Sequence, residues 1–174
     1  MAIQAGTYKL GPDKASLHVE TGRNGAAAKA GHDLIIDVNS WEATLEVGDS
    51  SSLALSADPT SLKVREGTGG MQALKDDDKE DIHKTIDKDV LKQKDITFTS
   101  SSIESASDGL TVSGDLELGG KTKPITFDVT ESGDTVTGSA SFKQSDWGIK
   151  PYSALFGALK VNDEVKVVFE GKLA

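Results

Sequence analysis

The chain has 174 residues, of which 36% are hydrophobic and 27% charged, so one folded domain with a thin or hollow core is expected and disorder throughout is excluded. It contains no cysteine, which excludes disulfides, thiolate metal sites and a cysteine nucleophile. The net charge of −9 repels phosphate backbones and anionic lipid surfaces, so nucleic acid is not expected as a partner.

The N-terminal residues do not resemble a targeting segment. Residues 1–7 lack the basic region and the apolar run of a signal peptide, and no stretch approaches the roughly 20 apolar residues that a membrane-spanning helix needs. We therefore expect a soluble, cytoplasmic protein without stable membrane insertion, or a periplasmic one if a signal peptide has been removed.

Apolar and polar residues alternate along most of the chain, which is the pattern of half-buried β-strands. From Leu110 to Leu118, for example, Leu, Val and Gly occupy one face while Thr, Ser, Asp and Glu occupy the other. At least eight strands are expected, and such short strands with one apolar face favour an antiparallel sandwich or barrel. The predicted strand segments are 17–19, 32–38, 41–47, 53–55, 62–64, 96–98, 110–118, 125–129, 136–142 and 165–171.

Two segments interrupt the alternation. In Asp76–Lys92 apolar residues recur at helical spacing behind three aspartates, which a helix dipole favours at its start, so we predict a helix of about four turns. In Pro151–Leu159 the apolar spacing predicts a short helix or turn that could cover a barrel mouth. The glycine-rich residues 66–72 lack the Gly-Lys-Ser/Thr of a phosphate-binding loop and are interpreted as a flexible connector.

The sequence contains no recognisable catalytic or metal-binding motif. The three histidines have no paired metal-ligand spacing, and no serine lies in a Gly-x-Ser-x-Gly context. His32 differs from the others because it lies in phase with the apolar face of its strand. Two interpretations of His32 stay open: a core histidine with a satisfied hydrogen bond, or a polar contact for the head group of a bound ligand.

A barrel of about eight strands can be filled with side chains or can hold one small ligand. Small residues at inward-facing positions would leave space, but they would equally allow large neighbours to interdigitate across a dry core. The residues alone leave both states open. These small residues are Ala28, Ala30, Ala43, Gly114, Gly138, Ala140 and Gly171.

Longer motifs, in the right order over most of the chain, resemble the YceI-like family of lipid-binding barrel proteins. Residues 114–127 (GDLELGGKTKPITF) resemble the family's strand, turn and Thr-Lys-Pro segment, and residues 141–149 (SFKQSDWGI) resemble its aspartate-aromatic-glycine motif. Residues 82–91 and 96–100 resemble its helix and following strand, and residues 161–167 a downstream segment. Gln144 stands where the family usually has an arginine.

The resemblance implies an extended, lipocalin-like antiparallel β-barrel of about eight strands, formed by a single domain over residues 1–174. It implies a non-enzymatic protein that binds, transports or stores a long apolar lipid, such as a polyisoprenoid or isoprenoid quinone, with no other cofactor. Related barrels can dimerise, which leaves a homodimer open. The main alternative is an enzyme that uses His32 as an acid or base on an apolar substrate inside the barrel.

Alternation and resemblance together assign candidate ligand-binding residues to the lumen of the barrel. His32 and Tyr152 are the candidates for polar contacts with a head group, and the other residues would contact the apolar chain. No catalytic residue and no metal ligand is assigned. The full set is His32, Leu34, Ile36, Leu45, Leu55, Phe98, Leu116, Phe127, Val129, Phe142, Trp147, Tyr152, Phe156, Val167 and Phe169.

Overall fold

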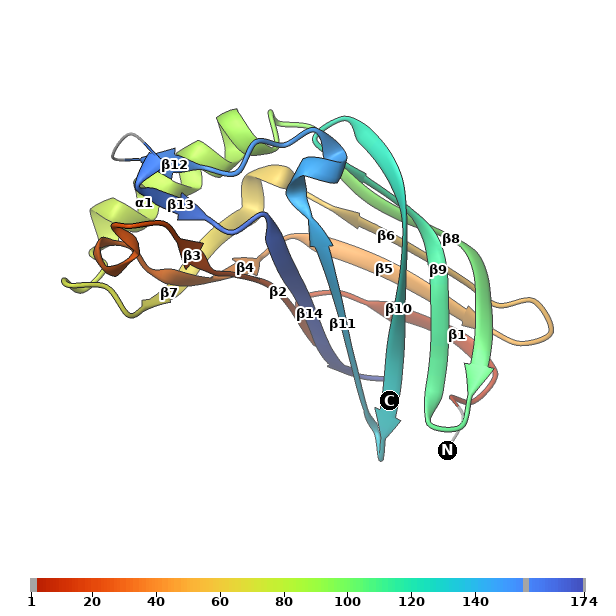
Figure 1. Cartoon of the computed structure of the whole chain (residues 1–174). Coiled ribbons are helices and arrows are strands. Elements are labelled where there is room, and N and C mark those ends of the chain that lie inside the picture. The colour runs from red at the N-terminus through yellow and green to blue at the C-terminus, as the bar shows by residue number, and fades with distance from the viewer. Residues whose placement is uncertain (1–2, 155–156, 174) are drawn as a thin grey trace.

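The computed structural model describes residues 3–154 and 157–173, and its main feature is one strongly curled antiparallel sheet that forms a half-barrel (Figure 1). The sheet has 11 strands in the order β1-β5-β6-β8-β9-β10-β11-β14-β2-β4-β7. The mainly β, antiparallel fold class is therefore confirmed. The strands are β1 (Gly6–Leu10), β2 (Ala15–Thr21), β4 (Asp33–Val38), β5 (Trp41–Val47), β6 (Ser52–Ala57), β7 (Leu62–Thr68), β8 (Ile96–Ala106), β9 (Gly109–Leu118), β10 (Lys121–Ser132), β11 (Thr135–Lys143) and β14 (Glu164–Lys172).

Each segment with alternating residues forms a strand of this sheet, as predicted. In β11 and β14, for instance, Gly138 pairs with Phe169 and Ala140 pairs with Val167. Residues of the apolar phase are thus placed opposite one another across the ladder, because side chains in a strand alternate with a period of two. One face of the sheet is consequently apolar and concave, and the other carries the polar residues.

The sheet has more strands than the roughly eight that were expected. The sequence does not predict β1, in which only Tyr8 and Leu10 carry the apolar phase. Nor does it predict β3 (Arg23–Asn24), β12 (Ser153–Ala154) and β13 (Leu159–Val161), which form a separate small sheet in the order β12-β13-β3. Strands of two or three residues have too few positions to show an alternating pattern.

This small sheet corrects only part of the predicted short helix or turn in Pro151–Leu159: Ser153, Ala154 and Leu159 are in strands, while Gly157 has 3-10 conformation and Ala158 lies in a turn. Ser153 pairs with Lys160, and Lys160 pairs in turn with Asn24 of β3. At Ser153, Ala154 and Leu159 the backbone therefore pairs as strand, although the apolar spacing of the segment suits a helix. Leu155 and Phe156, two of the residues on which the prediction relied, lie outside the described residues.

The strand order ends at β1 and β7, and the chain crosses between these two halves of the sheet at one corner. The 3-10 turn η2 (Pro59–Ser61) joins β6 to β7, and residues 39–40 join β4 to β5. The two crossings are bonded together: Asn39 N donates to Ser61 O at 3.1 Å, and Asp58 N donates to Ser40 O at 2.9 Å. This corner ties the two ends of the strand order together.

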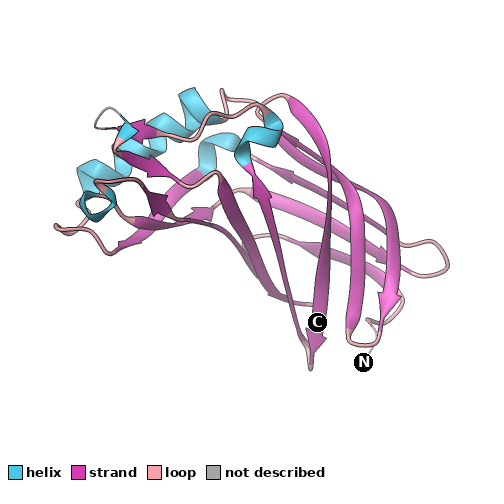
Figure 2. Cartoon of the chain, in the orientation of Figure 1, coloured by secondary structure: helices cyan, strands magenta, loops and turns pink. Residues whose placement is uncertain are grey.

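The predicted helix is present as α1 (Asp76–Thr85), followed by a π-helical turn at Ile86–Val90. At its start the carboxylate of Asp78 accepts a hydrogen bond from Lys75 N at 3.0 Å, so this part of the acidic run caps the helix. Helix α1 packs on β7, and its apolar residues join a core cluster with Trp41 and Leu62. Figure 2 shows the helical segments gathered at one end of the strands.

Within the described residues, no helix is long and apolar enough to cross a membrane. The tightest packing lies on β9 and β11, where Val112 and Val136 are only 1% and 2% exposed. Aromatic rings also meet across the concave face: Trp41 of β5 and Phe169 of β14 are 6.1 Å apart in a T-shaped arrangement. The interior is therefore densely packed in places, and the remaining space has definite walls.

Candidate functional site

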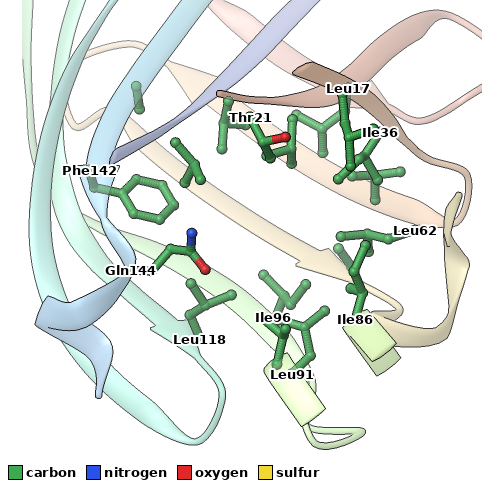
Figure 3. A pocket seen from close by; sticks show the side chains of 18 of the residues that line it. Leu17, Thr21, Ile36, Leu62, Ile86, Leu91, Ile96, Leu118, Phe142 and Gln144 are labelled. Carbon is green, nitrogen blue, oxygen red and sulfur yellow. The ribbon is translucent and has the colours of Figure 1, made fainter. Parts of the chain in front are cut away.

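The concave side of the sheet encloses a cavity of about 910 Å³, which we call the lumen. Side chains from all 11 strands of the main sheet and from the α1 region line it, and most of them are aliphatic or aromatic. In Figure 3, Leu17 and Ile36 on one side and Phe142 and Leu118 on the other point into the space between them. Protein interiors are normally packed as densely as organic crystals, so a space of this size can accept a ligand.

The structure brings the predicted lumen residues together, with two exceptions. The alternation identified them because the residues of one phase of a strand all face the same side of the sheet. Their role in ligand binding stays a prediction. The residues that line the lumen are His32, Leu34, Ile36, Leu45, Leu55, Phe98, Leu116, Phe127, Val129, Phe142, Tyr152, Val167 and Phe169.

Trp147 is the first exception, and its placement corrects the prediction. Its ring lies 4.8 Å from that of Phe142, and its indole Nε1 donates to Leu116 O at 2.8 Å. It belongs to the 3-10 turn η4 (Gln144–Trp147), where the chain leaves the strand and the period of two no longer applies. Trp147 thus supports the wall from behind Phe142. Phe156, the second exception, lies outside the described residues.

The barrel is packed at some of the small inward-facing residues and hollow at others. A Cβ atom on Gly114 would lie 2.4 Å from Thr99 O and 2.7 Å from the ring of Phe98, so this glycine makes room for a packed aromatic. Ala43, Gly138 and Ala140 instead line the open lumen. The barrel is therefore packed around Phe98 and hollow beside Ala43, Gly138 and Ala140.

Five of the polar and charged lining residues lie beside the small sheet β12-β13-β3, at an end of the lumen that we call the mouth. We define the mouth by Arg23, His32, Gln72, Tyr152 and Lys160. It also includes exposed apolar surface, because Tyr152 is 54% exposed. A polar rim around an apolar interior suits an amphiphilic molecule.

His32 has the satisfied hydrogen bond of the first interpretation but is half-buried at the mouth rather than in the core, and its contact with a ligand head group stays a prediction. Its Nε2 lies 2.6 Å from the carbonyl oxygen of Gln72, so the ring donates to a satisfied hydrogen bond while it lines the lumen. The bond also ties residues 66–72, predicted as a flexible connector, to the mouth, with a second tie from Arg23 to Thr68 O at 3.1 Å. Because the partner of Nε2 is a backbone carbonyl rather than a carboxylate, the contact does not resemble a catalytic acid–base pair.

Gln144 is a lumen residue that the sequence reasoning missed. It is 8% exposed and is the one buried polar or charged residue in the part of the chain that the structure describes. Its side-chain Nε2 donates to Asn162 O at 3.1 Å. The signal was present, since Gln144 continues the phase of Gly138, Ala140 and Phe142, but a polar residue does not stand out in a search for an apolar stripe.

The turn that carries Gln144 is anchored by a carboxylate. Asp163 accepts hydrogen bonds from Ser145 Oγ at 2.5 Å and from Ser145 N at 2.8 Å. Both bonds lower the pKa of the Asp163 carboxyl below its usual value, and the bond from the Ser145 side chain has the larger effect. Gln144 N also donates to Asp163 O at 2.9 Å, so both the backbone and the side chain of Gln144 are fixed.

Comparison with known proteins agrees with this architecture. A family model described as the YceI-like domain matches residues 8–173, nearly the whole chain. The chain belongs to the YceI-like family. A search of curated proteins returned no significant match.

Solved structures of YceI-like proteins show the same fold. BcnA of Burkholderia cenocepacia superposes with a TM-score of 0.64 at 19% identity, over 90% of this chain and 94% of that one. The YceI protein of Campylobacter jejuni superposes with a TM-score of 0.51 at 18% identity, over 75% of this chain and 78% of that one. At these identities the likeness establishes the YceI-like fold, while the lumen and its few polar groups have to be judged on this chain's own residues.

Proposed function

We propose that this protein binds a long apolar or amphiphilic molecule, of the polyisoprenoid or isoprenoid-quinone type, in its lumen, and acts as a non-enzymatic carrier or store. The observation that carries the proposal is the continuous apolar cavity of about 910 Å³. Ligand pockets in proteins span about 300–1,000 Å³, so this one lies near the upper end. Membership of the YceI-like family supports the same class of ligand.

The physical reason for a long chain is that apolar contact needs no directional partner. Each methylene group moved from water into an apolar site contributes about 0.8 kcal/mol. A lumen whose walls are mostly aliphatic and aromatic therefore gains affinity with every carbon that it covers. His32 and Tyr152 at the mouth are the proposed polar contacts for a head group that reaches that end.

Native mass spectrometry of the protein purified from cells, followed by organic extraction, tests this function. We expect an added mass that is lost on extraction and an extract that contains an isoprenoid-type lipid. The extracted protein should take up a long isoprenoid alcohol again. A protein that carries no ligand and binds no apolar chain after extraction would contradict the proposal.

A further inference from the structure

The amide of Gln144 is an isolated polar group in an apolar space. Figure 3 shows it pointing into the lumen among Phe142, Leu118 and Ile96. Burying a polar group without a hydrogen-bond partner is costly, so nearly all such groups in proteins are satisfied. A glutamine at this position therefore calls for a partner for each end of its amide.

Within the described residues, only one end of that amide has a hydrogen-bond partner. The nitrogen donates to Asn162 O, which fixes the orientation of the group and directs the oxygen away from Asn162. No side chain or backbone donor in the described residues bonds to this oxygen, and the oxygen is not fully buried. The oxygen is thus open to the lumen and available as a hydrogen-bond acceptor.

The arrangement favours one kind of ligand group. An amide oxygen accepts a hydrogen bond from a hydroxyl, but it repels the oxygens of a carboxylate or phosphate. The cationic lining side chains, Arg23 and Lys160, belong to the mouth, and Arg23 is already engaged with the carbonyls of Gly31 and Thr68. An anionic group next to Gln144 would therefore be desolvated without a counter-charge.

Resting on the proposed lumen function, we propose that Gln144 is a specificity-determining residue, whose side-chain oxygen accepts a hydrogen bond from an uncharged hydroxyl group of the bound amphiphile. The ligand class is then a neutral long-chain alcohol, phenol or quinol, held by a donor inside the lumen, rather than an isoprenoid phosphate. A water molecule is the alternative partner of the oxygen, and it would make the lumen indifferent to the hydroxyl.

The test compares a long isoprenoid alcohol with its methyl ether, which has the same chain and oxygen but no donor. Affinities are measured for the wild type and for Gln144→Met, which keeps the length of the side chain but removes its acceptor. We expect the substitution to shift the ratio of alcohol to ether affinity by about three- to tenfold toward the ether. The matched control is Thr21→Val, because Thr21 also lines the lumen but its hydroxyl is sealed from it.

An unchanged ratio in Gln144→Met, or an equal change in Thr21→Val, overturns the assignment while leaving the container function intact. Binding of neither probe to the wild type overturns both. A second measurement avoids any folding defect of the variant: the side-chain ¹⁵N amide signal of Gln144 in the wild type should shift with the alcohol and not with the ether. A signal that stays unchanged with the alcohol bound also overturns the assignment.

Discussion

Ala140→Phe offers a direct way to ask whether the ligand lies in the lumen. Ala140 lines the cavity on β11, between Gly138 and Phe142 and opposite Val167 of β14. The phenyl ring adds about six carbons to the wall, and these would take the place of about six carbons of a ligand chain, each of which contributes about 0.8 kcal/mol.

The size of the effect follows from the volume of the lumen. At about 30 Å³ for each water-sized group, a cavity of about 910 Å³ holds roughly thirty such groups. The Kd of isoprenoid alcohols should fall as the chain lengthens, by less per carbon than the roughly fourfold that full transfer from water would give, and level off near thirty carbons in the wild type. In Ala140→Phe it should level off about six carbons earlier, while shorter alcohols bind with unchanged affinity.

The assay is displacement of a neutral, polarity-sensitive dye by isoprenoid alcohols of increasing length. Ser141→Phe is the control, because Ser141 is exposed on the outer face of the same strand and its substitution should leave the chain-length limit unchanged. Thermal unfolding of both variants shows whether the fold is intact. If Ala140→Phe and the wild type level off at the same chain length, the chain is not bound in the lumen and the reasoning is refuted.

Three further predictions concern the mouth, the core and the pH dependence of stability. In Gly70→Ala the new Cβ would lie 2.7 Å from Nε2 of His32, at a backbone φ of +77°. The clash should disturb the mouth, so ligand release measured by stopped flow should accelerate. The control is Gly133→Ala, at φ +66° with open space around it, which should show the same left-handed backbone strain without faster release. Val112→Ala removes two methyl groups from a side chain that is 1% exposed, so urea unfolding should show a loss of about 1–3 kcal/mol; a loss below about 0.5 kcal/mol would mean that the site collapses around the gap. The carboxylate of Asp163, whose hydrogen bonds lower its pKa below the usual 3.8, stabilises the fold above that pH and loses this effect as the pH falls through the lowered value. Asp163→Asn should therefore be less stable than the wild type near neutral pH, with a gap in melting temperature that closes below about pH 4; a gap that persists in acid would rule out this role.

Much of the fold could be predicted because the alternation is a local property. Leu110–Leu118 shows which residues share a face without reference to any other strand, since side chains alternate wherever the backbone is extended. The helix start at Asp76 is equally local, because its signals lie within one turn. The same reasoning fails at Trp147, where a turn ends the strand, and at Ser153, Ala154 and Leu159, where pairing of β12 with β13 overrides the helical spacing.

By itself the sequence determined which residues face inward and that their face is apolar. It left open whether that face surrounds a packed core or a hollow, because alternation specifies direction but not the distance to the opposite wall. The tertiary structure decided this: Gly114 packs against Phe98, while Ala140 borders open space. It also decided the state of Gln144, whose amide nitrogen is satisfied by a residue 18 positions away and whose oxygen is left to the lumen, because a partner distant in sequence is fixed only when the chain has folded.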